Sequence, residues 1–252
     1  MTDRPPPASP CEGCTTSPPL AFDFTMAFQP IVDLQTKTIF AHEALVRGMA
    51  GEEAATIMAQ VDEHNRYRFD QQCRIKAIEL GAKLGVDGYL SINFLPNAVY
   101  RAEQCLRAAL AAAEATGFPA ERILFEFTEA EQVRDTHHLR NIVAVYKEHG
   151  FLTALDDFGA GYAGLTLLAE IQTDLIKLDM ALIRHIQCDR VRQAIVRKVV
   201  ELAEELGIRV VAEGIEHGEE LTALCDLGLT LFQGFHFARP AFQALPEVRW
   251  PA

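Results

Sequence analysis

From about residue 27 onward, short runs rich in Ile, Val, Leu and Phe alternate with longer segments of helical periodicity. Runs that are apolar throughout are typical of strands buried on both faces, as in the parallel sheets of α/β proteins. Eight such runs are present, at residues 28–32, 38–46, 88–93, 122–127, 152–156, 175–178, 208–212 and 230–233. Eight strands interleaved with helices predict a (β/α)8 barrel, and a doubly wound open sheet is the competing architecture.

The segments between these runs carry apolar stripes at helical spacing. Four of them are predicted helices, at residues 63–84, 97–116, 131–149 and 190–206. Gly150 and Gly207 follow two of these helices, in the position where a left-handed C-terminal cap favours glycine.

Residues 1–20 have no apolar periodicity and are rich in Pro, Ser and Thr, so we predict a flexible tail followed by one folded domain, residues 21–252. Cys11 and Cys14 form half of a zinc knuckle, and without a second ligand pair we interpret them as spectator thiols. The other four cysteines are dispersed, which indicates a reducing compartment and not a disulfide framework.

The net charge of −12 disfavours binding to DNA or RNA over long range. No apolar run is long enough to span a bilayer, and the N-terminus lacks a basic segment followed by an apolar one. We therefore expect a cytoplasmic protein without membrane insertion. An anionic substrate would need bound cations to offset the negative charge.

Polar residues stand at the ends of nearly all the predicted strands, where barrel enzymes carry their catalytic groups. They are Glu43, Arg47, Asn93, Glu126, Glu129, Asp156, Asp157, Lys177, Asp179, Glu213, Glu216 and Gln233. Taken singly, each would be interpreted as a helix cap or a surface charge. Their recurrence at the same relative place in seven consecutive units favours one shared site. Several carboxylates at a barrel mouth need neutralisation, and Mg²⁺ or Mn²⁺ suits carboxylate and amide oxygens.

These residues lie in a series of motifs that resembles the EAL domain, a family of cyclic di-GMP phosphodiesterases. The motifs are FQPIVD (28–33), EALVRG (43–48), SIN (91–93), EFTE (126–129), DDFGAGY (156–162), IKLD (176–179), AEGIE (212–216) and QGF (233–235). They occur in order across residues 24–245. The resemblance implies a modified TIM barrel whose first strand is antiparallel to the others.

The resemblance also implies a two-metal site. One Mg²⁺ or Mn²⁺ would be held by Glu43, Asn93, Glu126 and Asp156, and the second by Asp156, Asp157 and Glu213. Lys177 would contact the attacking water or the phosphate. Two metals can lower the pKa of a water held between them, and in-line attack would then open cyclic di-GMP to linear pGpG. Ca²⁺ would occupy the site and inhibit.

Further residues are assigned by the same resemblance. Arg47 would clamp a phosphate, with Leu45, Gln29 and Gln233 also contacting substrate. Glu129 would anchor the loop at residues 158–164, and Glu216 would support the site residues or contact substrate and water. A homodimer formed near that loop is expected.

Two other functions stay open at this point. One is a catalytically weak EAL domain that acts as a cyclic di-GMP receptor or binds a protein. The other is an unrelated metal-dependent barrel enzyme, such as a lyase acting on a carboxylate.

Overall fold

The computed structural model describes residues 19–99, 101–128, 136–161 and 164–251. Glu129 lies outside these residues, and so do Cys11 and Cys14 with most of the proposed tail. The tail and the domain boundary at residue 21 therefore stay predictions.

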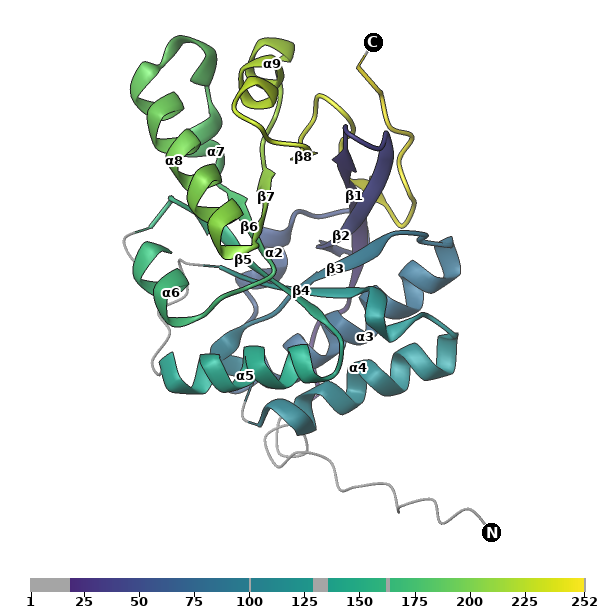
Figure 1. The fold of residues 1–252 in the computed structure, drawn as a ribbon. Helices are drawn as coiled ribbons and strands as arrows, with labels where there is room; N and C mark the ends of the chain where they lie inside the picture. The colour runs from purple at the N-terminus through teal and green to yellow at the C-terminus, as the bar shows by residue number, and fades with distance from the viewer. Residues whose placement is uncertain (1–18, 100, 129–135, 162–163, 252) are drawn as a thin grey trace.

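A closed ring of eight strands forms the centre of the molecule (Figure 1). β1 (Phe24–Asp33) and β2 (Thr38–Gly48) form an antiparallel hairpin. The ring continues in parallel through β3 (Tyr89–Asn93), β4 (Ile123–Thr128), β5 (Leu152–Phe158), β6 (Leu175–Leu178), β7 (Arg209–Ala212) and β8 (Leu231–Gln233).

Antiparallel pairing of β1 with β8 closes the ring, and a short strand, β9 (Ala241–Phe242), pairs with β1 outside it. Closure excludes the doubly wound open sheet. The predicted modified barrel with an antiparallel first strand is confirmed, and each of the eight predicted strands is present.

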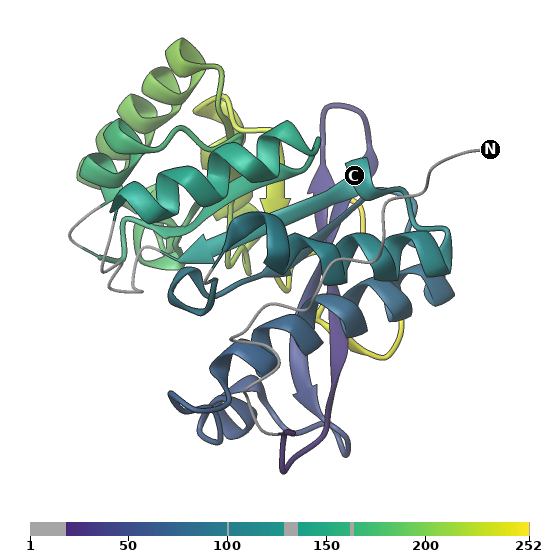
Figure 2. The ribbon, with the colours of Figure 1, turned by 90° about the horizontal axis from the view of Figure 1, so that it is seen from below.

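Helices surround the ring, and the four predicted ones are all present. The α-helices are α2 (Ala54–Met58), α3 (Arg66–Leu84), α4 (Ala102–Thr116), α5 (Thr136–Glu148), α6 (Gly164–Glu170), α7 (Met180–Ile183), α8 (Arg190–Leu206) and α9 (Gly218–Asp226). Short 3-10 turns occupy Pro96–Ala98, Ala120–Arg122 and Ile186–Cys188. Helices α3, α4 and α5 lie side by side along one flank of the barrel (Figures 1 and 2). Gly207 has a φ of 69° and caps α8 as predicted.

The hydrophobic core has two parts. The larger part lies between the outer faces of the strands and the helices. The smaller part fills the inside of the barrel towards the N-terminal ends of the parallel strands. We call this inner cluster the apolar plug; it consists of Ile31, Phe40, Ala41, Leu124, Ala154, Leu175, Val211 and Leu231. The plug makes the barrel a packed interior and leaves only the opposite end for polar groups.

Candidate active site

Most of the predicted site residues form one polar layer directly above the apolar plug. Side chains two positions apart on a strand point to the same face. On six of the parallel strands, a polar residue on the strand or directly after it follows a plug residue by two positions, in the pairs Ala41 and Glu43, Leu124 and Glu126, Ala154 and Asp156, Leu175 and Lys177, Val211 and Glu213, and Leu231 and Gln233. On antiparallel β1 the order is reversed, and Gln29 precedes Ile31. Strand alternation thus directs these seven side chains into the barrel mouth.

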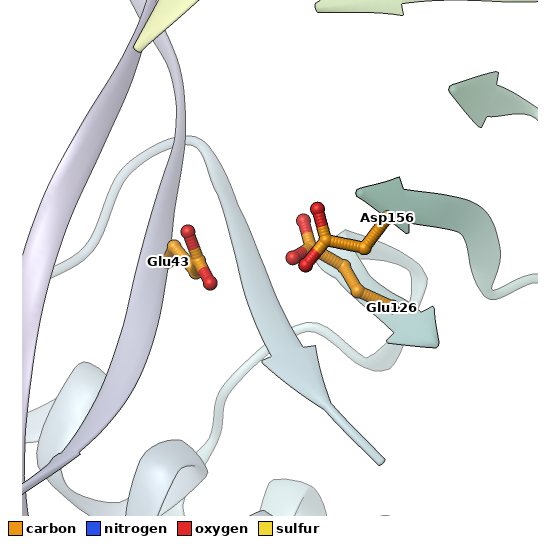
Figure 3. Close-up of side chains that lie close together, drawn as sticks. All are labelled: Glu43, Glu126 and Asp156. Carbon is orange, nitrogen blue, oxygen red and sulfur yellow. The ribbon is translucent and has the colours of Figure 1, made fainter. Parts of the chain in front are cut away.

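Two groups of carboxylates in this layer are close enough to share a cation. One oxygen each from Glu43, Glu126 and Asp156 lie within 4.8 Å of one another, and Figure 3 shows these side chains, from β2, β4 and β5, converging on one space. The same limit holds for Asp156, Asp157 and Glu213. Asp156 belongs to both groups, which is the arrangement that a bridging carboxylate requires. Carboxylate oxygens are ligands that Mg²⁺ and Mn²⁺ prefer, so the donor set fits these ions.

A backbone irregularity allows two consecutive aspartates to serve the same site. In a regular strand, Asp156 and Asp157 would point to opposite faces. The register of β5 against β6 shifts between Leu155 and Phe158, and Asp157 has a left-handed φ of 54°. Thr128 Oγ1 donates to Asp157 Oδ2 at 3.1 Å. The bulge brings both carboxylates to one side of the strand, a common use of bulges beside active sites.

Lys177 is the centre of the charge arrangement. Its side chain is 1% exposed, and its Nζ lies 2.5 Å from Glu213, 2.8 Å from Glu126, 3.2 Å from Asp156 and 3.4 Å from Glu43. Burial alone would lower the pKa of this lysine. The four carboxylates outweigh that effect and raise its pKa above the ordinary value, so Lys177 is a fixed cation.

Neutral side chains orient the carboxylates further. Glu43 accepts hydrogen bonds from Asn93 Nδ2 at 2.8 Å and from Gln233 Nε2 at 2.7 Å. Glu126 accepts a hydrogen bond from the Ser91 hydroxyl. Gln29 is buried beside Gln233 and donates from Nε2 to the Ala238 carbonyl at 3.0 Å. Sequence reasoning gave Ser91 no role, although it stands two positions before Asn93 and thus shares its face.

The surroundings shift the pKa values of the clustered acids in different directions. Burial raises the pKa of Glu126 to about 8 and also raises the pKa values of Asp156 and Glu213. Burial acts on Glu43 in the same direction, but Lys177 and the amides of Gln233 and Asn93 outweigh it and lower its pKa. Clustered acids that resist ionisation in this way are suited to binding additional positive charge.

An open cavity of about 190 Å³ lies over the polar layer. The predicted residues in its lining are Gln29, Glu43, Asp156, Lys177, Glu213, Glu216 and Gln233. Sequence reasoning missed Met180, Gly214, Gly234 and Phe235, which complete the wall. Three of these four stand inside the motifs named above and Met180 directly follows one, so the motifs were the available signal.

Three predicted residues lie at the edge of this arrangement. Leu45 and Arg47 are on the inward face of β2 beyond Glu43, half-buried and outside the cavity lining. Arg47 Nη1 donates to the Val46 carbonyl at 2.7 Å. Glu216 lines the cavity and accepts from Arg184 Nη2 at 2.9 Å.

A family model for the EAL domain matches residues 20–240. The chain belongs to the EAL domain family. Among curated relatives, the blue light- and temperature-regulated antirepressor BluF of Escherichia coli K12 is 32% identical over 241 residues, which cover 95% of this chain and 59% of BluF. The cyclic di-GMP phosphodiesterase RocR of Pseudomonas aeruginosa is 37% identical over 123 residues, 48% of this EAL chain and 31% of RocR.

Solved structures of EAL proteins share the fold closely. The cyclic di-GMP-bound form of a standalone versatile EAL protein from Vibrio cholerae O395 has a TM-score of 0.89 and 54% identity, covering 91% of this chain and 97% of that one. BlrP1 of Klebsiella pneumoniae, as a manganese and cyclic di-GMP complex, has a TM-score of 0.86 and 37% identity, covering 91% and 59%.

This EAL chain spans between 36% and 59% of the length of the first curated relatives it matches. Across the described residues, no helix is both long enough and apolar enough to cross a bilayer.

Proposed function

We propose that this EAL domain is a metal-dependent phosphodiesterase that hydrolyses cyclic di-GMP to linear pGpG. The observation that carries the proposal is the pair of carboxylate groups that share Asp156 at the barrel mouth. Relatives named as cyclic di-GMP phosphodiesterases and EAL structures named as cyclic di-GMP complexes support the choice of substrate.

The first group, Glu43, Glu126 and Asp156, would hold one Mg²⁺ or Mn²⁺ together with Asn93. The Asn93 amide nitrogen donates to Glu43, which leaves its carbonyl oxygen for a metal. Asp156, Asp157 and Glu213 would hold the second ion. When bound, two such ions supply charge neutralisation and an acidified water for attack on phosphorus. We infer that Ca²⁺ would fit the oxygen ligands and inhibit.

The chain's own groups would orient the substrate and its proton transfers. Lys177 is held as a charged donor by four carboxylates, so we assign it to stabilising charge at the phosphate or the water, not to removing a proton. Gln233 donates to Glu43 Oε2, whereas Asn93 donates to Oε1, so the two amides would fix the two sides of this carboxylate. Arg47 would turn from the Val46 carbonyl to a phosphate, where its planar fork can bind two oxygens. Gln29 and Leu45 would line the substrate path, and Glu216 and Glu129 would support the surrounding loops.

The remaining parts of the proposal follow from the substrate and from the EAL family. The enzyme would act in the cytoplasm, where its second messenger is made, and would pair as a homodimer near residues 158–164. The acidic surface argues against a nucleic-acid partner.

A receptor or protein-binding role is the second candidate, because the BluF relative is named as an antirepressor. The test incubates the purified protein with cyclic di-GMP and Mg²⁺ or Mn²⁺ and measures pGpG by chromatography. Metal-dependent pGpG release that Asp156→Asn abolishes would support the enzyme. Saturable binding of cyclic di-GMP without any product would support the receptor and refute hydrolysis.

A further inference from the structure

A buried charged cluster lies behind the polar layer, on the outer side of the barrel. Arg74 of α3 is fully buried, and its Nη2 lies 2.8 Å from Asp70 Oδ2, one turn earlier on the same helix. Arg74 Nη1 donates to the hydroxyl of Tyr146 on α5 at 2.6 Å. We call Asp70, Arg74 and Tyr146 the outer cluster. It joins α3 to α5, two helices that are separated along the chain by α4.

The outer cluster packs against the immediate neighbours of two proposed metal ligands. The Arg74 guanidinium lies over the rings of Phe94 and Phe125, 5.3 and 5.1 Å from their centroids. Phe94 follows Asn93, and Phe125 precedes Glu126. Because successive side chains on a strand alternate, the aromatic rings point out to Arg74 while Glu126 points into the barrel. A shift of these rings would therefore be transmitted to the ligand side chains through a single peptide unit.

Backbone hydrogen bonds tie the same two strand ends together. The Leu95 amide, two residues after Asn93, donates to Asp70 Oδ1 at 2.9 Å. The Phe94 amide donates to the Glu126 carbonyl at 2.9 Å. The end of β3 is thus fixed both to β4 and, through Asp70, to α3.

Stability alone gives little reason for this arrangement. A buried ion pair is commonly no more stabilising than well-packed apolar side chains of the same volume. What the pair adds is a fixed orientation, because Arg74 also binds the Tyr146 hydroxyl and Asp70 also binds the Leu95 amide. Metal sites lose affinity when the groups that orient their ligands are removed.

We propose that Asp70, Arg74 and Tyr146 are positioning residues that hold Asn93 and Glu126 in the geometry for binding a divalent cation. This inference rests on the proposed function, because it requires that Glu43, Asn93, Glu126 and Asp156 bind a metal.

The test measures Mn²⁺ affinity by calorimetry in the absence of nucleotide, together with the thermal midpoint of each metal-free protein. Tyr146→Phe removes only the hydroxyl that Arg74 binds, and Asp70→Asn keeps an acceptor for the Leu95 amide but removes the charge. Thr173→Val is the matched control for the first variant, because Thr173 is also buried and its hydroxyl donates to the Leu175 carbonyl near the plug. Val196→Ala on α8 is the control for a general loss of core packing.

We expect Tyr146→Phe and Asp70→Asn to weaken Mn²⁺ binding by about 10-fold or more, the effect typical of groups that orient metal ligands. Both controls should keep wild-type affinity whatever their thermal midpoints. Equal Mn²⁺ affinity in Tyr146→Phe and Thr173→Val would overturn the positioning role even if Asp70→Asn failed to fold. A wild-type protein that binds no Mn²⁺ would instead overturn the proposed metal centre itself.

Discussion

Replacing Lys177 with methionine tests whether one buried cation balances the acids of the barrel mouth. Within the described residues, Lys177 is the cation that lies within 4 Å of Glu43, Glu126, Asp156 and Glu213. Removing one partner from a buried ion pair costs about 3–5 kcal/mol, because the other charge is left uncompensated. At roughly 2–4 °C per kcal/mol for a chain of this size, the metal-free variant should melt about 6–20 °C below wild type.

The pH dependence of this loss has a definite sign. Without Lys177, the folded-state pKa values of Glu126, Asp156 and Glu213 rise further above their unfolded values, and Glu43 loses one of the groups that lower its pKa. The unfolded state then binds fewer protons near neutrality, so the stability of the variant falls as pH rises. The difference in thermal midpoint between wild type and Lys177→Met should therefore be larger at pH 8 than at pH 5.

Metal binding and turnover should respond differently in this variant. Mn²⁺ no longer competes with an ammonium group, so binding should be retained and the midpoint should rise more than in wild type. Turnover should fall by about 100-fold or more, because the donor that would stabilise charge at the phosphate or the water is gone. Lys198→Met is the control, since Lys198 is 75% exposed, and it should shift stability by no more than about 0.5 kcal/mol. A metal-free Lys177→Met protein with the wild-type midpoint at pH 8 would refute this reasoning.

Three other substitutions have distinct outcomes. Asp156→Asn should abolish both Mn²⁺ binding and pGpG formation while the circular dichroism spectrum is kept; a full hydrolytic rate in Mg²⁺ would exclude the two-metal site. Gly234→Ala should destabilise by about 3 kcal/mol in urea unfolding, because a Cβ there would lie 2.1 Å from the Ile215 carbonyl oxygen, and an unchanged midpoint would contradict this packing. His42 is buried without a partner for either ring nitrogen among the described residues, and burial lowers its pKa to about 4 from 6.5. The unfolded chain therefore takes up the proton first as pH falls, so between pH 7 and 5 the wild type should lose about 2 kcal/mol of stability relative to His42→Phe measured over the same range.

The strands of this fold were predictable because the barrel buries them on both faces. Residues 175–178, for example, are apolar apart from Lys177 and have the same bounds in β6. Short elements were not predictable. β9 has two residues and α7 has four, so neither carries enough of a periodic pattern to be distinguished from a loop. α9 was missed for another reason, since only Glu220, Leu221 and Leu224 are buried and its apolar stripe is therefore too short to be recognised.

The composition of the site was predictable, but its internal geometry was not. The motifs indicated that Asp156 and Asp157 act together, although a regular strand would separate them. Only the shifted register and the left-handed Asp157 explain how they do so. The sequence likewise placed Lys177 in the shared site but did not predict that its ammonium would lie within ion-pair distance of four carboxylates, because such contacts depend on barrel closure.

Charge balance connects the polar layer to its proposed cations. The five carboxylates of Glu43, Glu126, Asp156, Asp157 and Glu213, set against the ammonium of Lys177, would leave an excess of about four negative charges if all were ionised. Without metal, burial raises the pKa values of Glu126, Asp156 and Glu213. Protons retained on these acids then reduce the excess negative charge. Two divalent cations carry about the same charge, four, and would displace those protons. The same acids that make the metal-free site costly would thus favour a pair of cations under the proposed function, and a phosphodiester could then approach a barrel mouth whose own charge would repel it.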